Sequence, residues 1–157
     1  MRVFAIDGNV INETYTRDSE GIPGVAEEDD RLGDQLAVGD FDGNGFDEIA
    51  ATVRGEGIGQ PPSEIENAGA VNVFDLTHSN RHQLWTQDEI PSVPQEQPEA
   101  FDRFGSALVA GTINGGTKAD LIVGAPGNSI SESGTGSAVV LYSAPIDSLF
   151  GDRFEDD

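Results

Sequence analysis

One short stretch of the chain has side chains spaced as they are in loops that bind a metal ion. It reads Asp40-Phe41-Asp42-Gly43-Asn44-Gly45-Phe46-Asp47-Glu48, and the apolar run Ile49-Ala50-Ala51 follows directly. Oxygen-bearing side chains stand at the first, third and fifth positions, a glycine at the sixth, and an acid closes the stretch at the ninth. A hard cation such as Ca²⁺ takes about six to eight oxygen ligands, and a short loop supplies them only by turning sharply.

We therefore expect a calcium-binding β-hairpin loop over residues 40–48. Its predicted ligands are the side chains of Asp40, Asp42, Asn44 and Glu48 and the backbone carbonyl of Phe46. The pattern is the first half of an EF-hand loop without flanking helices, and the glycine at the sixth position permits the tight turn. The alternative is an acidic turn in which the same side chains bond to their own backbone and hold no metal.

Composition and charge exclude several classes of function. The 157 residues suffice for one domain with a real core, and the absence of cysteine excludes disulfides and thiolate metal sites. With 29 acidic and 8 basic residues the net charge is −21, which disfavours nucleic acids and anionic membranes as partners. The acidity is typical of proteins that stay hydrated in high salt, and equally of ordinary acidic extracellular calcium-binding proteins.

The stretch Met1–Asp7 already has the pattern of a strand that enters a turn, and it has no signal-peptide pattern. We expect either that the natural protein lacks a signal peptide or that this chain is an excised piece of a longer one.

The chain repeats itself about twice, at a spacing of about seventy residues. The matching segments are 31–39 with 103–111, 48–51 with 120–123, 69–74 with 136–142, and 3–18 with 73–88. Apolar periodicity predicts four short strands in each unit and no helix of useful length. The expected strands are 35–38, 48–53, 70–74 and 83–86 in the first unit, 106–110, 121–125, 137–142 and a weak one at 146–150 in the second, and 3–6 and 10–15 before them.

These units carry a resemblance to a known family. Phe104-Gly105, a spacer and then Asp120-Leu121-Ile122-Val123-Gly124-Ala125-Pro126 resemble an FG-GAP repeat. Residues 69–74 and 83–88 resemble the later strands of its prokaryotic versions. This repeat is the blade unit of the β-propeller at the head of integrin α-subunits and in many bacterial and archaeal surface proteins. The resemblance implies a calcium loop between the first two strands of the blade and a role in extracellular adhesion and recognition.

The expected fold is accordingly all-β, with four-stranded antiparallel β-propeller blades, about two full blades and a half blade. We expect residues 1–157 to form a single partial propeller unit. Within it we predict a half blade at 1–18, one repeat at 32–86 with its calcium loop at 40–48, and a second repeat at 104–150 with a degenerate loop at 112–120.

The ligand positions of the family fall on the five residues predicted above, although the family usually has Asp where this chain has Glu48. In the second unit only the closing acid, Asp120, is retained. The other positions hold Thr112, Asn114, Gly116 and Lys118. A lysine side chain offers no ligand oxygen and its ammonium opposes a nearby cation. We therefore expect one calcium site and not two.

The sequence predicts a calcium-stabilised, non-catalytic module for adhesion or recognition, located outside the cell or at its surface. Its partners should be proteins: other blades, its own copies or a surface ligand, with no nucleic acid and no membrane insertion. The alternatives are a self-assembling unit that completes a propeller as a homo-oligomer, a fragment of a larger propeller, and the propeller part of a secreted hydrolase or lyase.

Two weaker candidates compete with these sites. Phe74 and Trp85 could form a binding platform, but such residues more often fill the core between blades. His78 and His82 have a spacing that suits a metal on a helix, yet their segment is expected to be a hairpin loop.

Overall fold

The protein is built from antiparallel β-sheets. The computed structural model describes residues 2–4, 12–60, 62–90, 97–129 and 134–143, with side chains described from residue 14 onward. This part of the chain contains no α-helix, and its one short 3₁₀-helix is η1 (Gln87–Glu89). None of the helical structure found there is long and apolar enough to cross a membrane.

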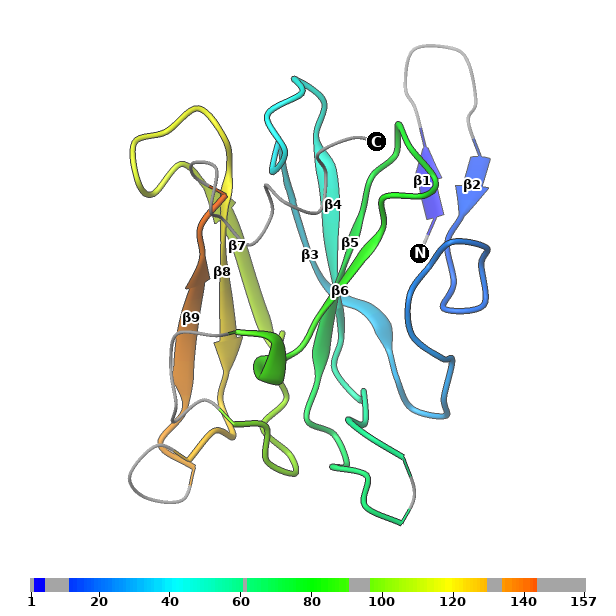
Figure 1. Ribbon diagram of the computed structural model, residues 1–157, viewed down its shortest axis with the longest axis vertical. Coiled ribbons are helices and arrows are strands. Elements are labelled where there is room, and N and C mark those ends of the chain that lie inside the picture. Colours follow the sequence, from blue (N-terminus) through cyan, green and yellow to red (C-terminus); the bar gives the residue numbers. More distant parts are fainter. Residues whose placement is uncertain (1, 5–11, 61, 91–96, 130–133, 144–157) are drawn as a thin grey trace.

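The first sheet has four strands in the order β3-β4-β5-β6 (Figure 1). The strands are β3 (Leu32–Gly39), β4 (Glu48–Val53), β5 (Ala70–Phe74) and β6 (Gln83–Trp85). The two central strands are buried almost throughout, as their continuous apolar character requires, and both have the bounds expected from the sequence. Strand β3 begins at Leu32 and not at residue 35, because a register irregularity between Leu32 and Leu36 lets the pairing continue past Gly33.

The second sheet repeats this arrangement with three described strands in the order β7-β8-β9. They are β7 (Ala107–Gly111), β8 (Asp120–Ala125) and β9 (Ser137–Leu141). The expected fourth strand at 146–150 lies outside the described residues. Among the described strands, β1 (Arg2–Phe4) and β2 (Asn12–Thr14) pair only with each other. The remainder of the strand expected at 3–6 and part of that at 10–15 are also outside the described residues. The all-β class with blade-like antiparallel sheets is confirmed.

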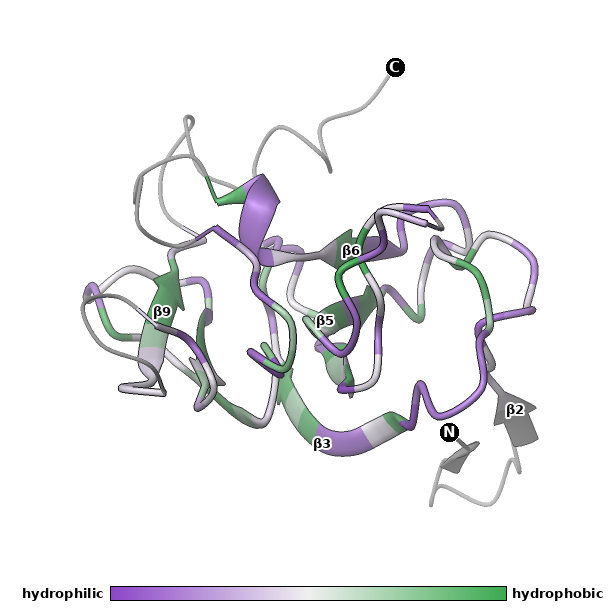
Figure 2. Ribbon diagram, turned by 90° about the horizontal axis from the view of Figure 1, so that it is seen from below, coloured by the Kyte–Doolittle hydropathy of each residue, from purple (hydrophilic) through white to green (hydrophobic). Residues whose placement is uncertain are grey.

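The main hydrophobic core lies between the two larger sheets. In Figure 2 the facing strands β5 and β9 are coloured as largely hydrophobic. The first sheet contributes Ala37, Ala50, Val71, Val73 and Trp85, and the second contributes Leu121, Val123, Ala125, Val139 and Leu141. Leu108 and Ala110 of β7 pack against this cluster. A smaller cluster of Ile22, Ala51 and Phe74 lies on the other face of the first sheet. Phe74 and Trp85 are both buried, so they are core residues and not an exposed platform.

A backbone seam joins the second repeat to the first. The segment that leads into the second sheet donates three N–H groups to carbonyls of the loop before β5: Phe101 to Glu66 at 2.9 Å, Arg103 to Asn67 at 3.1 Å and Phe104 to Ala68 at 2.8 Å. Gly69 follows those acceptors, and a Cβ at this position would collide with the backbone of Phe104. Glycine at residue 69 therefore allows the two repeats to approach at backbone distance.

Candidate metal centre

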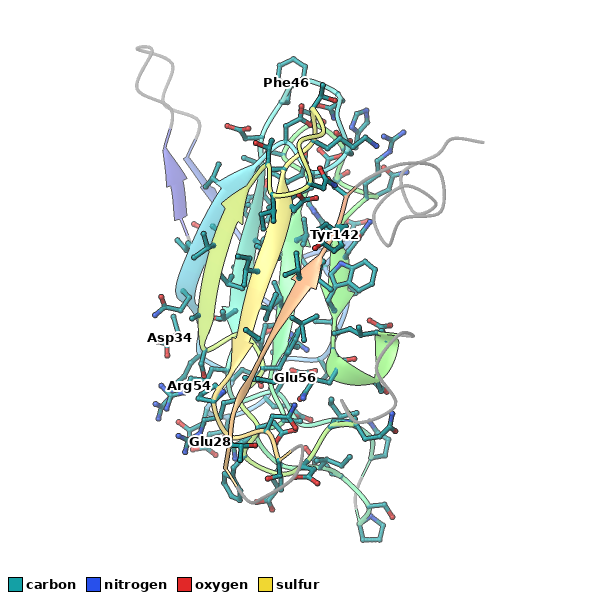
Figure 3. All side chains as sticks on the ribbon, turned by 90° about the vertical axis from the view of Figure 1, so that its left-hand side faces the viewer. Glu28, Asp34, Phe46, Arg54, Glu56 and Tyr142 are labelled. Carbon is teal, nitrogen blue, oxygen red and sulfur yellow. The ribbon has the colours of Figure 1, made fainter. Side chains whose placement is uncertain are left out.

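The predicted metal loop connects β3 to β4 at one end of the first sheet. Gly39 and Glu48 form the last cross-strand pair, so the loop residues project beyond the sheet. In Figure 3 Phe46 marks this end, and Glu56 lies near the other end of the sheet. There Glu56 forms a buried two-point ion pair with Arg17, with N–O distances of 2.8 and 2.7 Å, well separated from the loop.

Asp40 closes the loop on itself. Its Oδ1 accepts the backbone N–H of Gly43 at 2.6 Å, and its Oδ2 accepts that of Gly45 at 3.0 Å. Both glycines have positive φ values, 83° and 89°, a conformation that residues with a Cβ rarely adopt. The two glycines thus turn the backbone around the Asp40 carboxylate.

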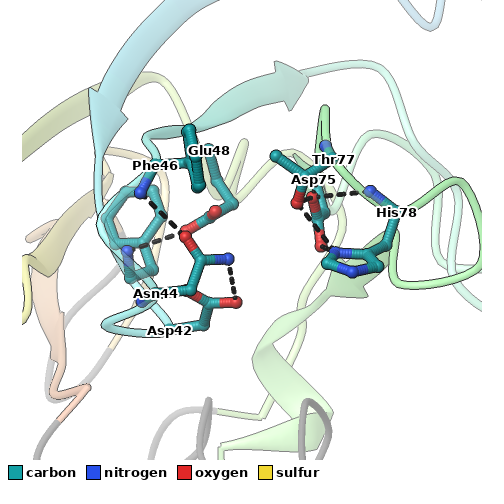
Figure 4. Close-up of polar contacts among 8 residues, drawn as sticks. Asp42, Asn44, Phe46, Glu48, Asp75, Thr77 and His78 are labelled. Atoms are coloured by element: carbon teal, nitrogen blue, oxygen red, sulfur yellow. Dashed lines mark hydrogen bonds and ion pairs between the residues drawn. The ribbon is translucent and has the colours of Figure 1, made fainter.

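The next two polar side chains continue the same inward pattern (Figure 4). Asp42 accepts the N–H of Asn44 at 2.9 Å through Oδ1 and the Asn44 side-chain amide at 2.8 Å through Oδ2. Asn44 Oδ1 in turn accepts the N–H of Phe46 at 2.8 Å. These are also the bonds of the metal-free turn that we gave as the alternative. A carboxylate has about four acceptor sites, so the bonds leave lone pairs for a cation.

Glu48 distinguishes this loop from an ordinary acidic turn. Its side chain is only 1% exposed, and its Oε2 accepts the N–H of Phe41 at 2.8 Å. Its Oε1 is buried and has no hydrogen-bond partner in the described structure. Carboxylate oxygens of Asp40, Asp42 and Glu48 lie within 4.8 Å of one another. A buried, unpartnered oxygen beside two further carboxylates is a place that a divalent cation would satisfy.

The electrostatics of Glu48 agree with this geometry. The pKa of its carboxyl is raised from 4.5 to about 7, chiefly by burial and also by the charges of Asp42 and Asp75, against the lowering effect of the N–H groups of Phe41 and Asp42. The charged form is thus disfavoured where negative charges gather without compensation. A cation held among these carboxylates would remove that penalty.

The loop brings the side chains of three of the five predicted ligands, Asp40, Asp42 and Glu48, close together. Asn44 is attached to the cluster through its bonds with Asp42. Phe46 is 63% exposed and its side chain carries no oxygen, so only its backbone carbonyl could contribute, and its role as a ligand stays a prediction. Asp47 is exposed, in agreement with its expected position facing solvent. The donor set of carboxylate and amide oxygens fits Ca²⁺.

Asp75 is an acid near the candidate metal centre that was not among the residues predicted from the sequence. Asp75 follows β5 and is 1% exposed, and Figure 4 shows it on the far side of Glu48 from Asn44. Its carboxylate accepts the N–H and hydroxyl of Thr77 and the N–H and Nδ1 of His78, at 2.6 to 3.1 Å. Burial alone would raise the pKa of Asp75, but these bonds together lower it. Asp75 therefore adds negative charge beside Glu48 while its own oxygens are engaged.

The two histidines do not form a metal site with each other in the described structure. His78 bonds to Asp75, whereas His82 packs against Tyr15 and Phe74 with ring centroids 5.8 and 5.6 Å apart. Asp40, Asp42 and Glu48 are the one metal-compatible cluster of acids and histidines found among the described residues.

Hydrogen bonds to one carboxylate close the second loop. Asp120, fully buried, accepts the N–H groups of Ile113 and Asn114 at 2.8 and 3.1 Å through Oδ2. Its Oδ1 accepts the Asn114 amide at 3.2 Å, and the N–H and hydroxyl of Ser143 at 3.0 and 3.3 Å. Burial would raise the pKa of Asp120, but the bonds from Ser143, Asn114 and Ile113 together lower it. Unlike Glu48, Asp120 has no orphaned oxygen.

Lys118 of this second loop lies against the first loop. A Cβ added to Gly43 would stand 2.8 Å from Lys118 Cε and 3.1 Å from Cγ, so the lysine stem covers that glycine. The next residue, Ala119, donates its N–H to the Asp40 carbonyl at 2.7 Å. The loop of the second repeat therefore packs on the candidate metal loop of the first.

Comparison with known families identifies the segment that holds this loop. Residues 32–74 match the family model of the FG-GAP repeat. This segment is similar to an FG-GAP repeat. The match runs from the first residue of β3 to the last residue of β5 and contains the candidate metal loop. The resemblance noted in the sequence is thus confirmed here. The second sheet follows the FG-GAP repeat with the same strand order and a loop at the same place.

Proposed function

We propose that this protein is a calcium-stabilised FG-GAP module of the β-propeller type that serves adhesion or recognition outside the cell and has no catalytic role. The observation that supports it most is the clustering of Asp40, Asp42 and Glu48, whose carboxylates each place an oxygen within 4.8 Å of the others, together with the buried, unpartnered Oε1 of Glu48. FG-GAP repeats are used in recognition of other proteins at cell surfaces, and the charge of −21 disfavours nucleic acids as partners.

The calcium acts structurally in this proposal. Without a cation, three carboxylates at close distance repel one another, and the repulsion destabilises the hairpin. Because the folded loop binds the ion and the unfolded chain does not, calcium should stabilise the folded protein. Asp40, Asp42, Asn44, Glu48 and the Phe46 carbonyl would hold it.

The first prediction is a rise in melting temperature with calcium relative to chelator. Calcium present at about 100 times its dissociation constant should add about 2.7 kcal/mol to the free energy of unfolding. Asp42→Ala should abolish most of the increment, and titration calorimetry should give one calcium per chain. Asp47→Asn, which removes one exposed charge from the same loop, is the matched control and should keep it.

Identical melting in calcium and in chelator, for a wild-type chain that is folded in both, would contradict the proposal. So would equal calcium responses of the wild type and Asp42→Ala. A second bound calcium that is lost in Asp120→Asn would contradict the assignment of a single site.

A further inference from the structure

The segment that bonds the second repeat to the first has an equivalent at the start of the first repeat. Among the described residues, two N–H groups of this equivalent segment have no acceptor. The docked segment 101–104 corresponds to segment 29–32 in the sequence repeat. Asp29 and Phe101 both have φ of 69°, and Arg31 and Arg103 both have φ of 55°. The two segments therefore present their backbones in the same uncommon left-handed conformation.

Two N–H groups of segment 29–32 lack the bonds by which their counterparts join one repeat to the other. The N–H groups of Phe101 and Arg103 bond to the preceding loop, whereas those of Asp29 and Arg31 have no acceptor among the described residues. Positive φ costs a residue with a Cβ about 1–2 kcal/mol. Asp30 holds the conformation locally, because its Oδ2 accepts the Glu27 N–H at 2.8 Å. The segment is thus preformed for docking on something outside the described chain.

The matching acceptors lie in the second repeat. Asn67, Ala68 and Gly69, which form the filled seam, correspond to Gly134, Thr135 and Gly136. Their backbones agree as well: φ is 53° at Asn67 and 68° at Gly134, and 87° at Gly69 and 73° at Gly136. No described residue donates a backbone hydrogen bond to the carbonyls of Gly134 or Thr135.

The apolar faces show the same complementarity. Leu108 and Ala110 of β7 pack on the core of the first repeat, but their counterparts Leu36 and Val38 in β3 are 51% and 56% exposed. On the other side, Ala37 is buried between the sheets, and its counterpart Val109 is 59% exposed. The exposed face of the first repeat, with Leu36 and Val38, is therefore equivalent to the face by which the second repeat packs on the first. The exposed face of the second repeat, with Val109, is equivalent to the face on which it packs.

We propose that copies of this chain bind one another head to tail, through a seam between them that is equivalent to the seam between the two repeats. Segment 29–32 of one copy docks on residues 134–136 of the next, with the Arg31 N–H directed to the Gly134 carbonyl. Leu36 and Val38 then cover Val109. A second copy is the occupant because one chain carries both halves of the seam, one on each repeat.

The contact is heterologous, so it forms a ring when the rotation closes. Propellers have about four to eight blades, which corresponds to about two to four copies of a two-repeat chain. In the sequence repeat β1 corresponds to β5, and β5 corresponds to β9. In the assembly β9 of the next copy therefore takes the place of β1, and the β1–β2 hairpin has to move aside. Its separate two-stranded pairing allows this.

Two variants that each block one half of the seam test the proposal. Val109→Glu places a charge on the receiving face and Val38→Glu places one on the docking face, and both positions are exposed in the single chain. Sedimentation of about 100 µM protein in about 1 M NaCl, where the Debye length is about 3 Å, limits repulsion between the acidic copies. The wild type should form a closed oligomer, and each variant should weaken association by more than tenfold.

Mixing the variants distinguishes head-to-tail docking from other contacts. Each retains the half of the seam that the other has lost, so an equimolar mixture should give a 1:1 dimer that grows no further. Ile113→Glu, an exposed apolar residue of the second loop, carries the same charge change and should assemble as the wild type does. Far-ultraviolet circular dichroism checks that each variant is folded.

A wild-type chain that stays monomeric under these conditions would overturn the proposal. A dimer that both variants form unchanged, or a mixture that fails to pair, would overturn it too. The readout is mass and not calcium-dependent melting, so failure here leaves the calcium proposal intact, and the converse also holds.

Discussion

Glu48 is the residue through which pH should affect the candidate metal centre. Its carboxyl has a pKa of about 7 in the folded chain, above the ordinary 4.5, because it is buried. Without metal, the stability that the protonated form contributes is fully present below pH 4.5 and is lost as the pH rises through about 7. Calcium requires the charged form, so it competes with this proton.

We therefore predict that calcium binds more tightly as the pH rises from 6 to 8, about tenfold overall, because a ligand must lose a proton over this range. Titration calorimetry at the two pH values, in buffers of different ionisation enthalpy, measures both the affinity and the proton released. Glu48→Gln should bind calcium weakly and with little dependence on pH. Tight binding that is the same at pH 6 and pH 8 would show that this carboxyl is not a ligand.

At the scale of the elements, the two equivalent loops, residues 40–48 and 112–120, are held closed by different sets of side chains. The first repeat offers a cluster of acids that suits a cation, whereas the second closes its loop with the hydrogen bonds of Asp120. Asp120 also reaches Ser143 just after β9, so it connects all three described strands of the second sheet at one end. These hydrogen bonds of Asp120 thereby hold the loop end of the second sheet together.

Asp120→Ala should consequently destabilise the protein by about 2–5 kcal/mol, because it leaves several backbone donors without an acceptor. Asn114→Ala removes one side-chain partner of Asp120 and the acceptor of the Gly116 N–H, and it should cost less because the Asp120 carboxylate keeps its other donors. The folded-state pKa of Asp120 is below the ordinary 3.8, so its contribution is present above that pH and is lost as the pH falls through the folded value. Urea unfolding of both variants in chelator at pH 7 and pH 3 measures this. Equal losses in the two variants at pH 7 would contradict the role of Asp120.

The elements were largely predictable, but their contacts were not. Short apolar runs such as those of β4 and β5 locate buried strands, and the oxygens at alternate positions of residues 40–48 locate the loop. The role of Asp75 depends on the pairing of Ile49 with Phe74, which brings the end of β5 beside Glu48. The position of Lys118 depends on how one repeat packs on the next. Both are long-range consequences of packing that local spacing does not encode.

At the scale of the whole molecule, the charge of −21 over 157 residues acts against the compact state. Few of the acids are compensated: the structure gives four ion pairs among the described residues, one of them involving a histidine. Salt screens the repulsion between exposed charges, with a Debye length that falls from about 30 Å at 0.01 M to about 3 Å at 1 M.

We predict that the melting temperature in chelator rises by about 3–6 °C between about 0.01 M and 1 M NaCl, equivalent to about 1–2 kcal/mol. Differential scanning calorimetry at a protein concentration too low for association measures the effect of salt alone. Potassium chloride should act like sodium chloride, because screening depends on ionic strength. A melting temperature that falls over this range would show that local ion pairs outweigh the general repulsion.

Asp40 belongs to the candidate metal loop of the first repeat, and its backbone carbonyl also accepts the Ala119 N–H from the loop of the second repeat. An ion that immobilises Asp40 would also anchor the strand that begins at Asp120, in the neighbouring repeat. Calcium would then govern the stiffness of the joint between the sheets, and its removal would loosen that joint together with the hairpin.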